Sequence, residues 1–140
     1  MGTQQALTTK QLELLTLLYS IEEFVDKEAK EEMVTPIDEI LISNCVYKEE
    51  EYDELTEALI AYGYVDDNIK LTTDGKQYIA LFIEDLQKKA ENPSIVMNNQ
   101  FSLINMEAFN IDNFIKIAKE CSVLDKVVNV VKLLKQLRNQ

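Results

Sequence analysis

The stretch Glu49–Gly75, EEEYDELTEALIAYGYVDDNIKLTTDG, decides the fold that we expect for this chain. Its first part predicts a helix over 48–62, because apolar residues recur at helical spacing and a glycine ends the run. Two short apolar runs around an Asp-Asp-Asn turn then predict a β-hairpin over 64–71. A threonine pair at 72–73 begins another helix. The expected order is therefore helix, hairpin and helix.

The residues before and after this stretch predict further helices. A Thr-x-x-Gln capping box at Thr8 opens a first helix that should run to about Phe24 or beyond, with leucines on more than one side. A Thr-Pro start signal predicts a short helix over 36–43. The helix after the hairpin should continue to about Ala90, where an Asn-Pro pair stops it.

The C-terminal third contains an ambiguous segment and two more expected helices. Residues 94–106 fit either a second hairpin or an extended arm exchanged between subunits. Capping residues then predict helices over 111–120 and from 123 to about 137. The last helix has an apolar stripe: Val123, Val127, Val130, Leu134 and Leu137. Such a stripe either packs against the rest of the chain or forms the interface of a homodimer.

The composition indicates to which broad class of protein the chain belongs. The chain has 140 residues, 46% of them hydrophobic, with only 3 glycines and 2 prolines, which favours a folded and largely helical protein. No apolar run approaches the roughly 18–20 residues that cross a bilayer, and no basic-then-apolar leader begins the chain. We therefore expect a cytoplasmic protein without a membrane segment. Cys45 and Cys121 are expected to be buried small apolar residues.

The absence of histidine limits the kinds of catalytic and metal-binding site that the chain can form. With no histidine in the chain, Ser-His, Cys-His and His-metal sites are excluded. Two cysteines cannot build a four-ligand zinc site, and neither a phosphate-binding glycine loop nor a calcium loop occurs. We expect no catalytic residues, no metal and no cofactor, and hence a protein that is not an enzyme.

The charge is strongly acidic and unevenly distributed. The net charge is −11; residues 1–90 hold 20 acids and 8 lysines, whereas residues 91–140 hold 5 acids and 6 bases. The predicted helix over 48–62 contains a dense run of carboxylates, and the turn of the predicted hairpin adds two more. The candidate interaction residues are Glu49, Glu50, Asp53, Glu54, Glu57, Asp66 and Asp67.

The order of elements resembles that of winged-helix transcription regulators of the MarR-like and PadR-like kind. The residues that carry the resemblance are Leu55, Leu59, Tyr62-Gly63-Tyr64-Val65, Ile69, Leu71-Thr72 and Gly75-Lys76. It covers roughly residues 8–90. It implies a mainly α (α+β) fold, in which a winged-helix domain with a small β-hairpin wing precedes a C-terminal helical segment.

The resemblance also suggests a division of the chain. Residues 1–91 would form the winged-helix domain, 92–109 a linker or hairpin arm, and 110–140 a C-terminal helical pair. In regulators of this kind the C-terminal helices commonly dimerise, so the resemblance places a dimerisation element in this last segment.

The acidic helix differs in charge from the helix that such regulators present to DNA. They present basic and polar side chains to DNA at this position, and phosphate contacts dominate DNA affinity. Carboxylates repel phosphates, so direct DNA binding is disfavoured here. We expect a non-catalytic winged-helix regulatory protein that acts by protein–protein interaction through its acidic face and self-associates through its C-terminal helices.

Two alternatives remain open at this point. One is a winged-helix transcriptional regulator that binds DNA as a dimer through basic residues outside the acidic helix, such as Lys10, 27–30 or 116–138. The other is an acidic inhibitor, of phage or plasmid type, that occupies the nucleic-acid-binding surface of another protein. The acidic run would also serve simply as a solvated helix face.

Overall fold

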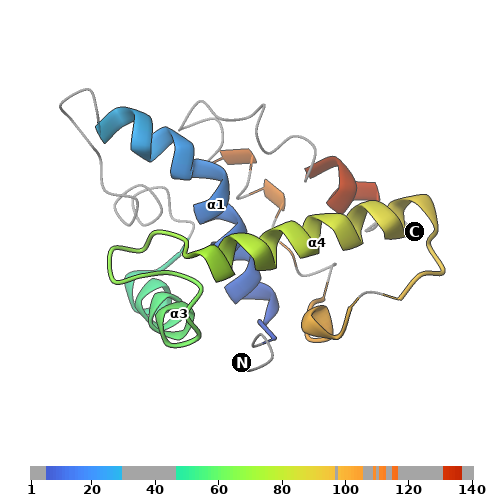
Figure 1. Ribbon diagram of the computed structural model, residues 1–140, viewed down its shortest axis with the longest axis horizontal. Helices are drawn as coiled ribbons and strands as arrows, with labels where there is room; N and C mark the ends of the chain where they lie inside the picture. The colour runs from blue at the N-terminus through green and yellow to red at the C-terminus, as the bar shows by residue number, and fades with distance from the viewer. Residues whose placement is uncertain are drawn as a thin grey trace.

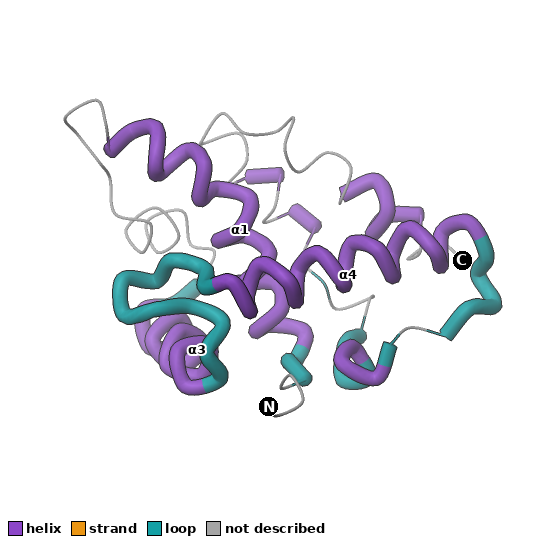
Figure 2. The backbone as a smooth tube through the Cα atoms, in the orientation of Figure 1, coloured by secondary structure: helices purple, strands orange, loops and turns teal. Residues whose placement is uncertain are grey.

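The computed structural model is built from helices joined by loops (Figure 1; Figure 2). It describes residues 6–29, 47–96, 98–105, 109, 111–112, 115–116 and 131–136, with the side chains of 20–29 left out. The named elements are α1 (Thr9–Ala29), α3 (Glu49–Ala61), α4 (Thr73–Glu91) and a 3-10 helix, η1 (Asn99–Phe101). Residues 111–112, 115–116 and 131–136 are also helical.

The helices begin where the local sequence signals predict. The backbone N–H of Thr8 donates to the Gln11 side chain at 3.0 Å, and the Gln11 N–H donates to the Thr8 hydroxyl at 3.3 Å, which confirms the capping box. At the start of α4, the Thr72 hydroxyl accepts from the N–H of Gly75 at 3.1 Å. Gly63, at φ +80, follows the end of α3 in the left-handed conformation that glycine adopts without strain.

The predicted α+β fold with a β-hairpin wing is wrong. In place of two paired strands, the described residues contain a single antiparallel bridge, between Val65 and Leu71, and no sheet. The reason is local: the N–H groups of Tyr64 and Val65 both donate to the carbonyl of Leu59, at 3.0 and 3.4 Å. The end of α3 therefore takes the Tyr64 N–H that a longer ladder would need, and the Thr72 carbonyl, its partner in such a ladder, accepts from the N–H of Lys76 instead.

The loop between the bridged residues is closed by a side chain. One oxygen of the Asp66 carboxylate accepts from the N–H groups of Asn68 and Lys70, at 2.8 and 3.1 Å. Ile69 has φ +61, an outlying conformation for a β-branched residue, and its N–H donates to the Asp66 carbonyl at 3.0 Å. The loop is thus a compact side-chain-capped turn.

The centre of the core is α1, which packs against both α3 and α4. Every side chain from Leu12 to Leu18 is buried, including those of Glu13 and Thr16, so this part of α1 is covered on all sides. This confirms the expectation of a helix buried on more than one side. The Thr16 hydroxyl donates to the Leu12 carbonyl at 2.7 Å, which satisfies one polar group of the buried stretch.

A connected series of aromatic rings extends the core along α4. Tyr78 lies 4.8 Å from Tyr64 and 5.2 Å from Phe101, measured between ring centroids. Phe82 continues the series, with its ring centroid 5.4 Å from that of Phe101 and 6.2 Å from that of Phe109. Rings at these separations stabilise one another beyond their buried area.

The segment expected as a linker contributes to this core. Phe101 and Phe109 are 3% and 1% exposed, and both belong to the same hydrophobic cluster as α1 and α4. Within 94–106, the described residues form no strand, so the second hairpin is not found there. Residues 98–105 instead fold onto their own chain. The predicted short helix over 36–43 lies outside the described residues, as do Cys45 and Cys121.

Replacing Gly75 by alanine should destabilise the protein strongly. A Cβ at Gly75 would lie 2.1 Å from the backbone carbonyl oxygen of Tyr64, so the loop or the helix must move. We expect a loss of about 3 kcal/mol, measured by urea unfolding, at the upper end of what overpacking usually costs.

Gly63→Ala is the matched control for this substitution. Its Cβ would meet nothing within 4 Å, so only the positive φ is penalised, at about 1 kcal/mol. Equal losses for the two variants would contradict the close approach of Tyr64 to α4.

Candidate functional site: the acidic face of α3

The burial pattern of α3 separates an apolar face from a charged one. Tyr52, Leu55 and Leu59 are buried in the core, together with Thr56. Glu51, Ala58 and Ile60 are half-buried, and the other positions of the helix are exposed. The exposed acids, which we call the acidic face, are Glu49, Glu50, Asp53, Glu54 and Glu57. The structure thus brings all five candidate residues of this helix to one side.

Like charges crowd this face. Glu50 lies three and four positions before Asp53 and Glu54, and Asp53 lies four positions before Glu57, spacings that bring side chains together on a helix. Each such pair costs a few tenths of a kcal/mol, about 0.2–0.5. The first turn offsets part of this cost, because carboxylates near a helix N-terminus interact favourably with its dipole. The buried contacts of the apolar face of α3 stabilise the helix against the remaining repulsion.

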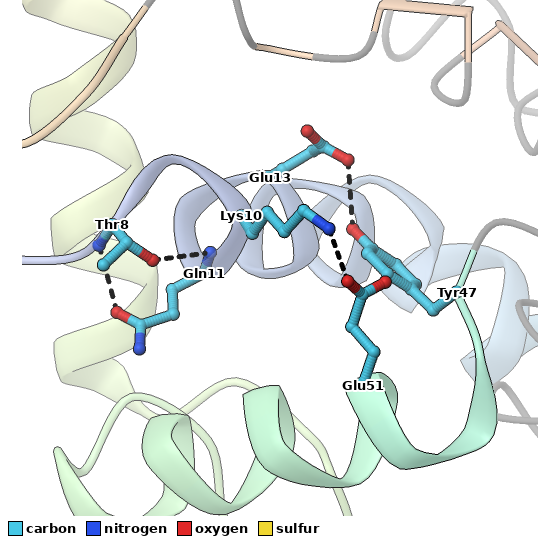
Figure 3. A network of polar contacts seen from close by, with 6 residues as sticks. All are labelled: Thr8, Lys10, Gln11, Glu13, Tyr47 and Glu51. Carbon is cyan, nitrogen blue, oxygen red and sulfur yellow. Dashed lines mark hydrogen bonds and ion pairs between the residues drawn. The ribbon is translucent and has the colours of Figure 1, made fainter.

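Glu51 is the acid of α3 that is engaged with the rest of the chain. It is half-buried and forms an ion pair with Lys10 of α1 (Figure 3). The lysine lies within the first turn of α1, two residues after Thr8, whose side chain caps that helix. The pair therefore links the start of α3 to the start of α1 at a partly exposed position. It also engages Lys10, one of the basic residues on which the DNA-binding alternative relied.

A buried carboxylate and a tyrosine lie beside this ion pair. The Tyr47 hydroxyl donates to the Glu13 carboxylate at 3.3 Å, and each residue is only 4% exposed (Figure 3). Burial raises the pKa of the Tyr47 hydroxyl well above its usual range, and the negative charges of Glu13 and Glu51 act in the same direction. Tyr47 thus remains a proton donor to Glu13.

The two acids of the loop have different surroundings. Asp66 and Asp67 are both exposed, but the Asp66 carboxylate closes the turn by accepting two backbone N–H groups. Asp66 consequently has a structural role that the sequence pattern did not reveal. Asp67 is the exposed neighbour of Asp66 in the same loop.

Only one residue of the predicted dimerisation stripe is described. Leu134 is 1% exposed and belongs to the single-chain core, as does Val131. The Gln136 side chain donates to the Ala90 carbonyl at 3.2 Å, which holds this helical turn against the end of α4. Packing within the chain, one of the two interpretations of the stripe, therefore accounts for Leu134. Val123, Val127, Val130 and Leu137 lie outside the described residues.

Other kinds of site are not seen in the part of the chain that the structure describes. Among those residues, no group of three or more Cys, Asp or Glu side chains is placed to hold a metal ion. No helix there is both long and apolar enough to cross a membrane.

Comparison with known proteins adds no relative. Neither the protein-family models, nor the curated proteins, nor the solved structures give a match to this chain.

Sequence reasoning missed the polar cluster of Lys10, Glu13, Tyr47 and Glu51. A signal was present, because Glu13 interrupts a run of leucines on a helix expected to be buried on several sides. Its partner could not be inferred, since Tyr47 lies 34 residues away along the chain.

Alkaline pH should destabilise the protein in part through Tyr47. A tyrosine ionises near pH 10 in the unfolded chain, whereas the folded state keeps the Tyr47 proton to higher pH. The unfolded state therefore binds fewer protons above about pH 10, and the free energy of unfolding falls as the pH rises further. Urea unfolding at several pH values above 9 should show this slope, and Tyr47→Phe should make it shallower.

Tyr62→Phe serves as the control, because Tyr62 is 39% exposed. It should leave the slope unchanged. Tyr47→Phe should also lower stability at pH 7, since the buried Glu13 carboxylate loses a hydrogen bond. An identical pH dependence of Tyr47→Phe and the unaltered protein would contradict the assignment.

Proposed function

We propose that this chain is a non-catalytic regulatory protein that binds a basic segment of another protein through the acidic face of α3. The observation that supports this proposal is the exposure of five carboxylates on one side of a helix whose other side is anchored in the core. A surface with charges of one sign attracts partners with charges of the opposite sign and raises their association rate. Lysine- and arginine-rich segments are the complementary chemistry.

The contacts of three described lysines support a protein partner over DNA. Lys10 is paired with Glu51 of α3, and Lys88 is paired with Glu84 at 2.9 Å. The Lys89 ammonium group donates to the carbonyls of Pro93 and Ile95 at 3.2 and 2.9 Å. These lysines are engaged within the chain, while the acidic face would repel phosphates. The relationship to MarR-like and PadR-like regulators stays a prediction.

A charge-reversal series tests the proposal. The variant Glu50→Lys/Glu54→Lys/Glu57→Lys should bind a labelled arginine- and lysine-rich peptide at least roughly tenfold more weakly than the unaltered chain. Each exposed pair contributes up to about 1 kcal/mol, and reversal replaces attraction with repulsion. Fluorescence anisotropy at several salt concentrations measures the affinity.

The matched control is Glu84→Lys/Glu91→Lys/Asp112→Lys, which changes the net charge equally at exposed positions away from α3. It should lose much less affinity. Equal losses in the two variants would show that net charge, and not the acidic face, attracts the peptide. Salt-dependent binding of mixed-sequence duplex DNA by the unaltered chain would favour the DNA-binding alternative.

Self-association through residues 110–140 is a separate part of the proposal. Light scattering should give twice the mass of one chain for the full-length protein, and one mass for a chain truncated after residue 107. Because Leu134 is buried within a single chain, circular dichroism must accompany the measurement to show that the truncated chain is folded. A monomeric full-length protein would exclude the homodimer.

A further inference from the structure

Asp85 is a buried carboxylate of α4 whose hydrogen bonds go to one residue of the following segment. It is 7% exposed and, with Glu13, is one of two buried charged residues in the described part of the chain. One oxygen accepts from the backbone N–H of Asn98 at 2.6 Å, and the other accepts from the Asn98 side-chain amide at 3.0 Å. A single residue thus supplies two donors to one carboxylate.

Residues 98–105 run from this point back along α4 to the start of α1. The hydroxyl of Tyr78 donates to the Gln100 carbonyl at 2.7 Å and accepts from the N–H of Leu7 at 3.1 Å. The N–H of Asn105 then donates to the Thr9 hydroxyl at 2.8 Å. Tyr78 precedes Asp85 by seven residues, so the segment covers about 10 Å of α4 at 1.5 Å per residue.

One aromatic side chain fastens the middle of the segment. Phe101 is 3% exposed and contacts the rings of Tyr78 and Phe82. The flanks are different: Leu103 is 57% exposed and Asn98, Asn99, Ser102 and Asn105 are exposed as well. Ile104 is partly buried and packs against the core, so the segment is attached through Phe101, Ile104 and a few hydrogen bonds, while most of its other side chains are exposed.

We propose that residues 98–105 form a strap that opens as a unit while α1 and α4 remain folded. Segments with few buried apolar contacts and exposed backbone hydrogen bonds open at lower free energy than the core. Opening separates Asn98 from Asp85, which then gains water, and removes Phe101 from the rings of Tyr78 and Phe82. The open state turns apolar ring surface of α4 to solvent. The strap is thus a device that controls exposure of this surface, independently of the acidic face.

Native-state hydrogen exchange tests the strap directly. The backbone amides of Asn98 and Asn105 donate to Asp85 and Thr9, outside the strap, so both should exchange through one shared opening, faster than the helical amides of α1 and α4. In Asp85→Asn, the new amide oxygen can accept from one donor of Asn98. The new amino group then faces the other donor of Asn98, and two donors cannot form a hydrogen bond with each other. Exchange of the strap amides should then accelerate roughly tenfold or more, because a hydrogen bond to a charged group is lost.

Two further variants complete the experiment. Glu84→Gln, at an exposed neighbouring position, should leave the strap amides unchanged. Asn98→Ala keeps the backbone donor, removes the side-chain donor and lies at an exposed position, so it should fold and give a smaller acceleration than Asp85→Asn. The proposal is overturned if the strap amides of the unaltered protein exchange no faster than those of α4. It is also overturned if both Asp85→Asn and Asn98→Ala accelerate the strap and α4 amides equally.

Discussion

The structure depends on the burial of α1 between Leu12 and Leu18. A helix covered on every side removes a large apolar area from water, at roughly 25 cal/mol for each Å². It also requires neighbours around its whole circumference, and α3 and α4 supply two of them. Both helices must consequently direct their apolar sides toward α1. The acidic face of α3 follows from this arrangement, because the side of α3 opposite Tyr52 and Leu59 faces water.

Polar contacts at the start of α1 set the arrangement of its neighbours. Leu7 donates to Tyr78 of α4, Thr9 accepts from Asn105 of the strap, and Lys10 pairs with Glu51 of α3. Almost consecutive residues therefore contact three different parts of the chain. Hydrophobic burial is non-directional, whereas these bonds have defined geometry, so they select one orientation of the helices among those that would cover α1.

Helices were predictable because their signals are local. The Thr8 capping box, the Thr72 cap and the apolar stripe of α3 each lie within one or two turns, and the acidic face follows as the complement of that stripe. The predicted hairpin was wrong because the Tyr64 N–H, which would extend the ladder, donates to the Leu59 carbonyl at the end of α3. The contacts of Glu13 with Tyr47 and of Lys10 with Glu51 span 34 and 41 residues, so no local pattern contains them.

The close approach of Tyr64 to Gly75 has a consequence for the proposed binding at the acidic face. The loop after α3 lies against the first turn of α4, and the Thr72 hydroxyl donates to the Gly63 carbonyl at 2.6 Å. The backbone that carries the carboxylates is thereby anchored at the far end of α3, while Glu51 anchors the near end. On the side of this chain, the proposed binding would therefore order mainly the acidic side chains, and a preorganised backbone leaves more of the electrostatic attraction as affinity.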